Sequence, residues 1–199
     1  QLYRSDGFRS QSASWRGTLA GRWSVDLAGG LRLALSARVH KAAADNPGYL
    51  SAARFRSDPY GKEPGIQNDG AEKDFATLRT DLQYALSAEL KLLAFAYATR
   101  QDFSRWFTRP VSGTQTQREE SYDRKVHGAG VNLNGRHAAA LPLNWVVGVE
   151  TFRESTDYEY YDNLDRRRRV NPAVNYRNSV LRSLSAFVEL EAPLHALFK

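Results

Sequence analysis

The sequence predicts an all-β fold, an antiparallel up-and-down meander of about seven long strands. Apolar and polar residues alternate along segments of roughly ten residues, which is the periodicity of strands with two different faces. The connections between these segments are alternately short and long. No stretch approaches the roughly 18 consecutive apolar residues that a membrane-spanning helix needs.

The N-terminal half contains four of these segments. SWRGTLAGRW follows a polar, turn-rich opening, and the Asp and paired Gly of Ser24–Gly30 predict a tight turn after it. The clearest strand is LRLALSARV, in which Leu, Ala and Val alternate with Arg, Ala and Ser. The segment Lys41–Asp74, rich in Pro, Gly, Asn and Asp, predicts a long loop. FATLRTDLQYAL and LKLLAFAYATR then form two strands around a turn at Ser87–Glu89.

The C-terminal half repeats this arrangement. A second long loop is expected over Asp102–Asp123, followed by a strand in RKVHGAGVNLNGRH and a short turn at Ala138–Pro142. The last hairpin runs from Leu143 to Leu190. Its arms LNWVVGVETF and SVLRSLSAFVEL alternate well, and a polar loop rich in Tyr and Arg, Ser155–Asn178, separates them. A soluble sandwich rarely joins two matched strands by so long a loop.

Composition limits the classes of function. The 199 residues contain no cysteine, which excludes a disulfide framework, a thiolate metal site and a cysteine nucleophile. The net charge of +6 would suit nucleic acid, but the arginines are spread along the chain and the run Arg166–Arg169 has Asp162 and Asp165 beside it, so we expect no nucleic-acid partner. The four histidines lack metal-ligand spacing, and no catalytic constellation is present. We expect no cofactor, no metal and no enzymatic activity.

Strand length and loop pattern favour a transmembrane β-barrel. Strands of about 9–11 tilted residues cross a bilayer, and bacterial outer-membrane barrels have short periplasmic turns and longer extracellular loops. A soluble, secreted all-β module that binds carbohydrate or another ligand would also alternate and stays open as an alternative, as does a small stand-alone outer-membrane barrel. About seven strands do not close in the even-numbered bacterial manner. The sequence therefore predicts a section of a larger transmembrane β-barrel.

Several segments resemble a known family. The opening SDGFR, the arm GVETFRESTDYEYYDN with its return RSLSAFVELEAPL, and the segments GYL and FRSDPYG resemble the barrel of TonB-dependent outer-membrane receptors, especially those for ferric siderophores. The resemblance implies that residues 1–199 are a barrel section without the plug domain and TonB box of such receptors. It implies a bacterial outer-membrane location, a ferric siderophore as ligand, outer-membrane lipid and lipopolysaccharide around the barrel, and TonB as partner through a region not seen here.

Arginine and aromatic residues of the long loops are the candidate ligand-binding residues. Arg binds a bulky anionic complex through charge and forked hydrogen bonds, while Tyr, Trp and Phe supply flat apolar contact. The candidates are Arg105, Trp106, Phe107, Tyr158, Tyr160, Tyr161, Arg166 and Arg167. The alternative is that these aromatics form an interfacial girdle and the arginines bind lipopolysaccharide or loop carboxylates.

Overall fold

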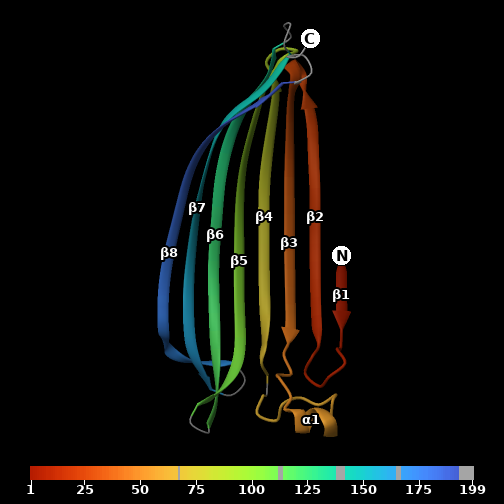
Figure 1. The fold of residues 1–199 in the computed structure, drawn as a ribbon, viewed down its shortest axis with the longest axis vertical. Coiled ribbons are helices and arrows are strands. Elements are labelled where there is room, and N and C mark those ends of the chain that lie inside the picture. The colour runs from red at the N-terminus through yellow and green to blue at the C-terminus, as the bar shows by residue number, and fades with distance from the viewer. Residues whose placement is uncertain (67, 112–113, 138–141, 165–166, 193–199) are drawn as a thin grey trace.

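Eight strands form a single antiparallel sheet, in which they are neighbours in the order in which they occur in the chain (Figure 1). The computed structural model describes residues 1–66, 68–111, 114–137, 142–164 and 167–192. The strands are β1 (Leu2–Ser5), β2 (Ser14–Leu27), β3 (Leu31–Asp45), β4 (Gly70–Ala85), β5 (Leu90–Val111), β6 (Thr114–His137), β7 (Leu143–Leu164) and β8 (Arg168–Glu191). The predicted all-β meander is confirmed. The eighth strand, which was not expected, is β1; it is four residues long and lies in the polar opening segment.

Short connections lie at one end of the sheet, and the chain between β3 and β4 extends from the other (Figure 1). The 3₁₀ turn η1 (Ala28–Gly30) joins β2 to β3, and residues 86–89 join β4 to β5. The predicted turn Ala138–Pro142 lies outside the described residues except for Pro142. At the opposite end, which we call the long-connection end, residues 46–69 carry the short helix α1 (Ala52–Ser57). The central part of the predicted loop Lys41–Asp74 is thereby confirmed.

Two of the predicted long loops are strands instead. Backbone pairing continues through most of 102–123 and 155–178, so these segments extend β5 to β8. The prediction was wrong because polar side chains occupy both faces of the sheet here, which removes the apolar alternation but not the backbone pairing. The four strands are 22 to 24 residues long, about twice the length needed to cross a bilayer.

Apolar side chains cover one face over the half of the sheet next to the short connections. Directly opposed residues form rows across this apolar face, and one row consists of Val25, Leu33, Leu82, Ala94, Val131, Val149 and Ala186. The large side chains of the apolar face are exposed: Leu184 is 77% and Val188 70% accessible. Within the described chain, this face is therefore not packed against a protein core. Toward the long-connection end the same side of the sheet becomes charged and carries residues such as Lys41 and Asp74.

The opposite, polar face carries large aromatic rings beside glycines. Phe95 and Tyr97 of β5 lie directly opposite Gly130 and Gly128 of β6. A Cβ atom at Gly130 would lie 2.7 Å from the Phe95 ring, and one at Gly128 would lie 2.8 Å from the Tyr97 ring. The rings thus lie directly against the glycine backbone, and a larger residue at either glycine would displace them. The small Ala94, Ala96 and Ala98 of the same strand fall on the apolar face.

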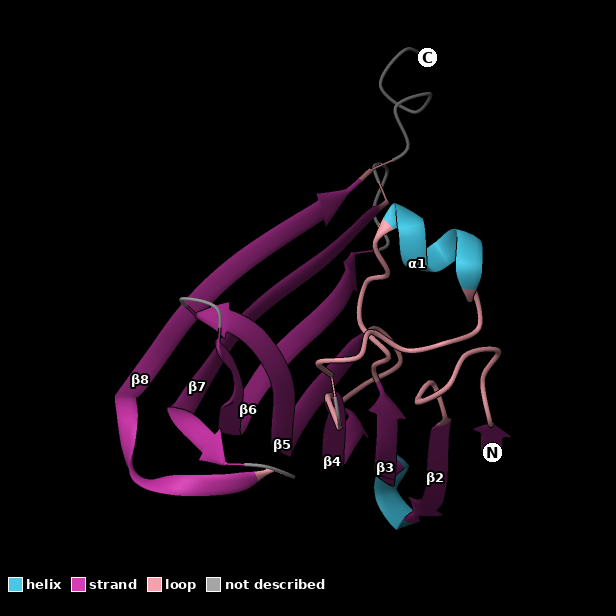
Figure 2. Cartoon of the chain, turned by 90° about the horizontal axis from the view of Figure 1, so that it is seen from below, coloured by secondary structure: helices cyan, strands magenta, loops and turns pink. Residues whose placement is uncertain are grey.

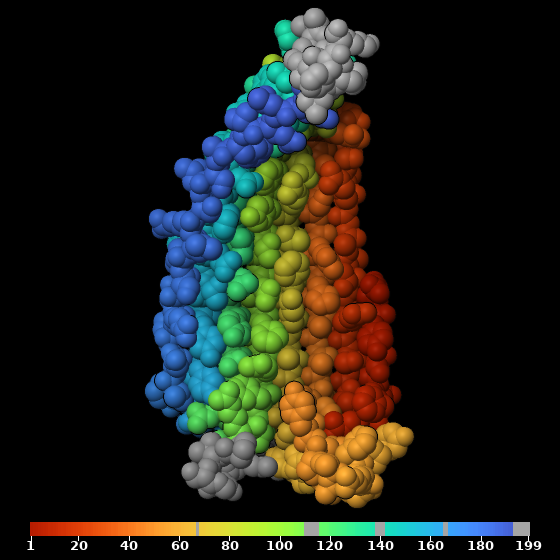
Figure 3. All heavy atoms as spheres, in the orientation of Figure 1, coloured from red at the N-terminus to blue at the C-terminus, as the bar shows by residue number. Residues whose placement is uncertain are grey.

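The sheet forms a curved wall. Figure 2 shows that the strands do not lie in one plane, because the sheet bends between β2 and β8. In Figure 3 the side chains of neighbouring strands form a continuous surface along the length of the molecule. No helix among the described residues is long and apolar enough to cross a membrane. The outermost strands of the described sheet, β1 and β8, each pair on one side.

Candidate functional site

The structure separates the predicted ligand-binding residues onto two sides of the sheet. Successive residues of a strand point to opposite faces, and all of these residues except those after Leu164 lie in the extended parts of β5 and β7. The polar face carries Arg105, Phe107, Tyr158 and Tyr160, whereas Trp106, Tyr161 and Arg167 lie on the opposite side. Arg166 lies outside the described residues. The two groups have different surroundings.

Five aromatic residues form a cluster on the polar face near the long-connection end. The members of this aromatic cluster are Phe103, Phe107, Tyr122, Tyr158 and Tyr160. The ring centroids of Tyr122 and Tyr158 are 5.0 Å apart, those of Phe103 and Tyr122 5.9 Å, and those of Phe107 and Tyr160 6.3 Å. All three pairs are tilted, which is a favourable geometry for aromatic rings. The cluster spans β5, β6 and β7.

Four guanidinium groups border the aromatic cluster. Arg105 and Arg109 lie over Phe107, at 5.0 and 4.8 Å from the ring centroid, while Arg118 lies over Tyr160 and Arg177 over Tyr158. Arg105 is bound to Glu120 (2.6 Å), and Arg118 pairs with Asp162. Arg109 and Arg177 have no ion-pair partner among the described residues. These two cations are therefore available to an anion that approaches the rings.

Tyr158 of the cluster is suited to act as a neutral hydrogen-bond donor. Burial, with a smaller contribution from the negative charge of Glu120, raises the pKa of the Tyr158 phenol above its ordinary value of 10.0. The phenol therefore stays protonated at physiological pH and offers an O–H group beside the Arg177 guanidinium. Together the cluster and its arginines present flat apolar area, hydrogen-bond donors and positive charge on one face.

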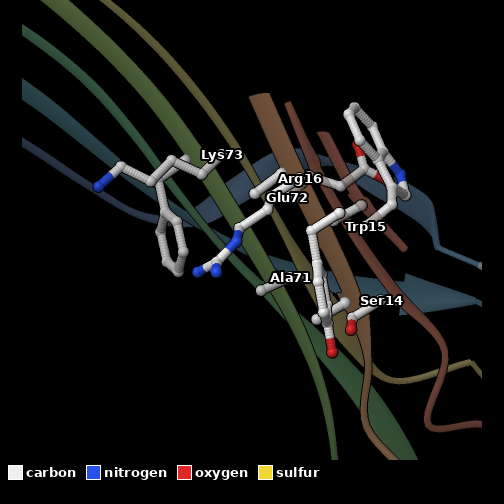
Figure 4. Close-up of a pocket in the computed structure, with 11 residues that line it drawn as sticks. Ser14, Trp15, Arg16, Ala71, Glu72 and Lys73 are labelled. Carbon is white, nitrogen blue, oxygen red and sulfur yellow. The ribbon is translucent and has the colours of Figure 1, made fainter. Parts of the chain in front are cut away.

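A hollow of about 450 Å³ lies next to the aromatic cluster on the same face. Phe103 belongs to both, and the other side chains around the hollow include Tyr3, Arg16 and Lys73. Arg16 lies 5.1 Å from the ring centroid of Tyr3. In Figure 4 the indole of Trp15 points away from Arg16 and Lys73, as expected for the next residue of a strand. The hollow extends the positively charged, aromatic surface from β5 toward β1.

On the opposite side of the sheet, Trp106 is buried beneath Arg167. Trp106 is only 8% exposed, and the Arg167 guanidinium lies 4.2 Å from the indole centroid. The same guanidinium donates to the Asn68 backbone carbonyl (3.0 Å) and forms an ion pair with Glu72 (3.0 Å). These contacts join the β7–β8 connection to the β3–β4 connection. Arg167 and Trp106 are thus occupied by contacts within the chain.

Tyr161 belongs to a second set of internal contacts on this side. Glu119, which is 2% exposed, accepts two hydrogen bonds from Arg169, at 3.0 and 2.6 Å. Arg169 lies over the Tyr161 ring at 4.4 Å from its centroid, and the Tyr161 hydroxyl donates to Glu159 (2.9 Å). Burial and then this hydrogen bond raise the pKa of Tyr161, while the Glu119 hydrogen bond raises that of Arg169. The arrangement fixes β6, β7 and β8 to one another.

Asp69 fastens the end of the β3–β4 connection to β5 and β6. Its carboxylate, in a residue only 2% exposed, accepts hydrogen bonds from the Thr108 backbone N–H (2.5 Å), the Thr108 hydroxyl (2.7 Å) and the Gln117 amide (3.1 Å). Buried carboxylates require such partners because their desolvation is costly. The long-connection end is therefore held together by polar contacts from three separate parts of the chain.

Sequence reasoning identified only part of the polar-face site. It missed Phe103, Arg109, Arg118, Tyr122 and Arg177. The spacing in FSRWFTR contains the missing signal, because Phe103, Arg105, Phe107 and Arg109 occur at every second position. In the described part of the chain, no group of three or more His, Cys, Asp or Glu side chains could hold a metal ion.

Comparison with solved structures shows the class of fold. No protein-family model and no curated protein matches the chain. The fold is that of a section of the β-barrel of TonB-dependent outer-membrane receptors, since the solved structures it matches include several ferric receptors. The chain spans about a quarter to about a third of the length of these proteins.

The individual matches share little sequence with the chain. The unliganded ferric citrate transporter FecA matches with a TM-score of 0.77 and 15% identity, over 93% of this chain and 28% of its own. The ferric-catecholate import receptor Fiu of E. coli K12 matches with a TM-score of 0.69 and 13% identity, over 95% of this chain and 36% of its own. The ferric preacinetobactin receptor BauA of Acinetobacter baumannii matches with a TM-score of 0.65 and 12% identity, over 96% of this chain and 33% of its own. The RagAB peptide importer also matches, with a TM-score of 0.61 and 11% identity, over 92% of this chain and 26% of its own. Proteins with this fold therefore carry more than one kind of cargo.

Proposed function

We propose that the chain is part of an outer-membrane TonB-dependent transporter that imports ferric siderophores, and that it has no enzymatic activity. In this proposal residues 1–199 supply a section of the barrel, and the plug domain and TonB box lie elsewhere in the protein. The apolar face, including Trp145, Val147 and Val149, meets membrane lipid, and the polar face lines the lumen. The long-connection end then faces the outside medium, where it forms part of the ligand vestibule.

The observation that carries the ligand proposal is the aromatic cluster on the polar face together with Arg109 and Arg177, two guanidinium groups without an ion-pair partner in the described part of the chain. A ferric siderophore complex that is bulky, aromatic and anionic needs flat apolar contact together with positive charge. The cluster offers both on neighbouring strands, beside the hollow at Phe103. The likeness to three receptors for ferric complexes supports iron complexes as the cargo.

Of the residues first predicted from the sequence, we propose that four contact the ligand: Arg105, Phe107, Tyr158 and Tyr160. The contacts of Trp106, Tyr161 and Arg167 support a different role for these three, which is to hold the vestibule in shape from its other side. Their replacement would then alter ligand binding only indirectly, through the position of the strands.

The test is the substitution Arg109→Gln in the complete receptor. Because Arg109 has no carboxylate partner in the described chain, its loss removes a charge-assisted contact with the ligand and leaves no buried carboxylate unpaired. We expect the Kd for the cognate ferric complex to rise about tenfold, which corresponds to about 1.4 kcal/mol. Tryptophan fluorescence quenching or isothermal titration with ferric citrate, a ferric catecholate and ferric preacinetobactin would measure it.

The matched control is Arg136→Gln, which removes an exposed arginine from the opposite end of the same face. This variant is expected to bind the ferric complex as the parent does. Equal affinity of the Arg109→Gln receptor and its parent would contradict the proposed site. Binding of peptides and of none of the three ferric complexes would contradict the proposed cargo, and a chain that is monomeric in buffer without detergent would contradict the barrel.

A further inference from the structure

Three basic residues form a row at the border of the apolar face. His127 of β6 lies directly opposite Arg153 of β7, and Arg153 lies directly opposite Arg182 of β8. All three side chains are exposed. The next pair along β7 and β8 in the direction of the short connections, Thr151 and Leu184, already belongs to the apolar face. The two guanidinium groups therefore border the continuous apolar surface, with Ser155 and Val180 as the next pair beyond them.

The cations of the next two rows on this side of the sheet, two to four residues farther toward the long-connection end, are neutralised by aspartates. Lys41 is bound to Asp74 at 3.0 Å, Arg100 to Asp102 at 3.1 Å, and Lys125 to Asp123 at 3.3 Å. In β7, the corresponding aspartate is Asp157, and it accepts hydrogen bonds from Tyr176 (3.0 Å) and Asn178 (2.6 Å). Among the described residues, neither Arg153 nor Arg182 has an ion pair or a side-chain hydrogen bond.

Two unpaired arginines directly opposite each other are unfavourable on their own. Directly opposed side chains have Cβ atoms roughly 5 Å apart, and like charges at this separation destabilise a strand pair. An anion held between them reverses the effect, and the planar guanidinium fork matches the oxygens of phosphate. The neighbouring apolar surface, with Leu184 and Val188 exposed, offers contact to acyl chains attached to such an anion.

We propose that Arg153 and Arg182 bind a phosphate group of lipopolysaccharide, whose acyl chains lie along the apolar face beside Leu184. The inference rests on the proposed function in two respects, namely that this face meets lipid and that the long-connection end faces the outside medium. It goes beyond that function by placing a specific lipid at β7 and β8. Lipopolysaccharide is favoured over a glycerophospholipid because the row lies on the long-connection side of the apolar face, which is the extracellular side in outer-membrane barrels.

The test compares the complete receptor with its Arg153→Gln/Arg182→Gln double variant, both purified in detergent and freed of lipid. Native mass spectrometry with added bisphosphorylated lipid A would measure retention of the lipid. We expect the double variant to bind about tenfold more weakly, since it loses two charge-assisted contacts to phosphate. The control Lys41→Gln removes a cation on the same side of the sheet, in the row of Asp157, that is already paired with Asp74, and is expected to retain lipid A as the parent does.

A second measurement separates lipid binding from a purely structural role. Without lipid, the single variant Arg182→Gln is expected to melt at a higher temperature than the parent, because it relieves the repulsion from Arg153. With lipid A present, the parent is expected to gain more thermal stability than the variant. Equal gains would overturn the proposal, and so would equal retention of phosphatidylglycerol and lipid A by the parent.

Failure of this inference can be distinguished from failure of the proposed function. Ferric-complex binding is measured in the same preparations, and the double variant is expected to keep the parent's Kd, because Arg153 and Arg182 lie on the face opposite the aromatic cluster. Loss of lipid selectivity with intact ferric binding overturns the lipid site alone. A receptor that binds lipid A through these arginines but no ferric complex supports the lipid site and contradicts the cargo.

Discussion

Replacing Gly130 by valine is expected to destabilise the folded barrel by about 1–3 kcal/mol, the usual cost of forcing extra atoms into a packed site. A Cβ atom at this position would lie 2.7 Å from the Phe95 ring and 3.1 Å from Cβ of Glu150. The ring has little freedom to move away, because the Arg79 guanidinium lies over it at 4.6 Å from the centroid. Arg79 in turn is held by Asp81 at 2.7 Å. The added side chain must therefore displace a connected set of residues.

Urea unfolding of the complete protein in detergent would measure this effect as a lower midpoint. The matched control is Gly21→Val, another strand glycine, at which an added Cβ atom would meet no atom within 4 Å. That variant is expected to be as stable as the parent or slightly more stable, since Gly is entropically costly in strands. Equal midpoints for the Gly130→Val variant and its parent would show that the Phe95 ring is not fixed against β6.

Removing the Asp69 carboxylate is expected to release the β3–β4 connection from the rest of the long-connection end. In Asp69→Ala, the Thr108 N–H, the Thr108 hydroxyl and the Gln117 amide lose a charged acceptor in a buried place. Hydrogen bonds to charged groups contribute about 1.5–3 kcal/mol each, so the local loss amounts to several kcal/mol. We expect the Thr108 amide to exchange with solvent at least a hundredfold faster, which corresponds to a loss of protection on the order of 3 kcal/mol.

Hydrogen–deuterium exchange of peptides covering 105–109 would measure the release, and limited proteolysis within 46–69 would report it independently. Asp58→Ala is the control, because Asp58 is an exposed carboxylate of the same connection whose side chain forms no hydrogen bond within the described chain. It is expected to leave exchange at Thr108 unchanged. Unchanged exchange in Asp69→Ala itself would mean that backbone pairing between β5 and β6 suffices to protect this amide.

The regular half of the sheet could be predicted from the sequence because one face is apolar there. Leu31, Leu33 and Leu35 alternate with polar and small residues, and such a pattern has few structural interpretations. The extended halves of β5 to β8 could not be recognised in this way. Both of their faces mix charged and polar side chains with aromatic ones, so the contrast between an apolar and a polar face is missing even though the hydrogen-bonded pairing continues. β1 escaped notice because four residues are too few to show a period.

The candidate site could be predicted in residue type but not in arrangement. Arg105, Trp106 and Phe107 were grouped because they are consecutive, and a strand places the middle one on the other face. The contacts of Asp69 and Arg167 could not be foreseen at all. Asp69 is 39 residues from Thr108, and Arg167 is 99 residues from Asn68. Such contacts depend on which strands become neighbours, and no local pattern encodes that.

The long ribbon of β5 and β6 restricts how its length can change. An insertion of one residue directly after Asp102 would turn every later side chain of β5 to the other side, moving Trp106 onto the polar face and Arg105 and Phe107 off it. An insertion of two residues would keep each side chain on its own side and only shift its height. Among homologous proteins, lengths of this ribbon should therefore differ by even numbers of residues wherever both sides keep their roles, or by odd numbers where a β-bulge absorbs the extra residue.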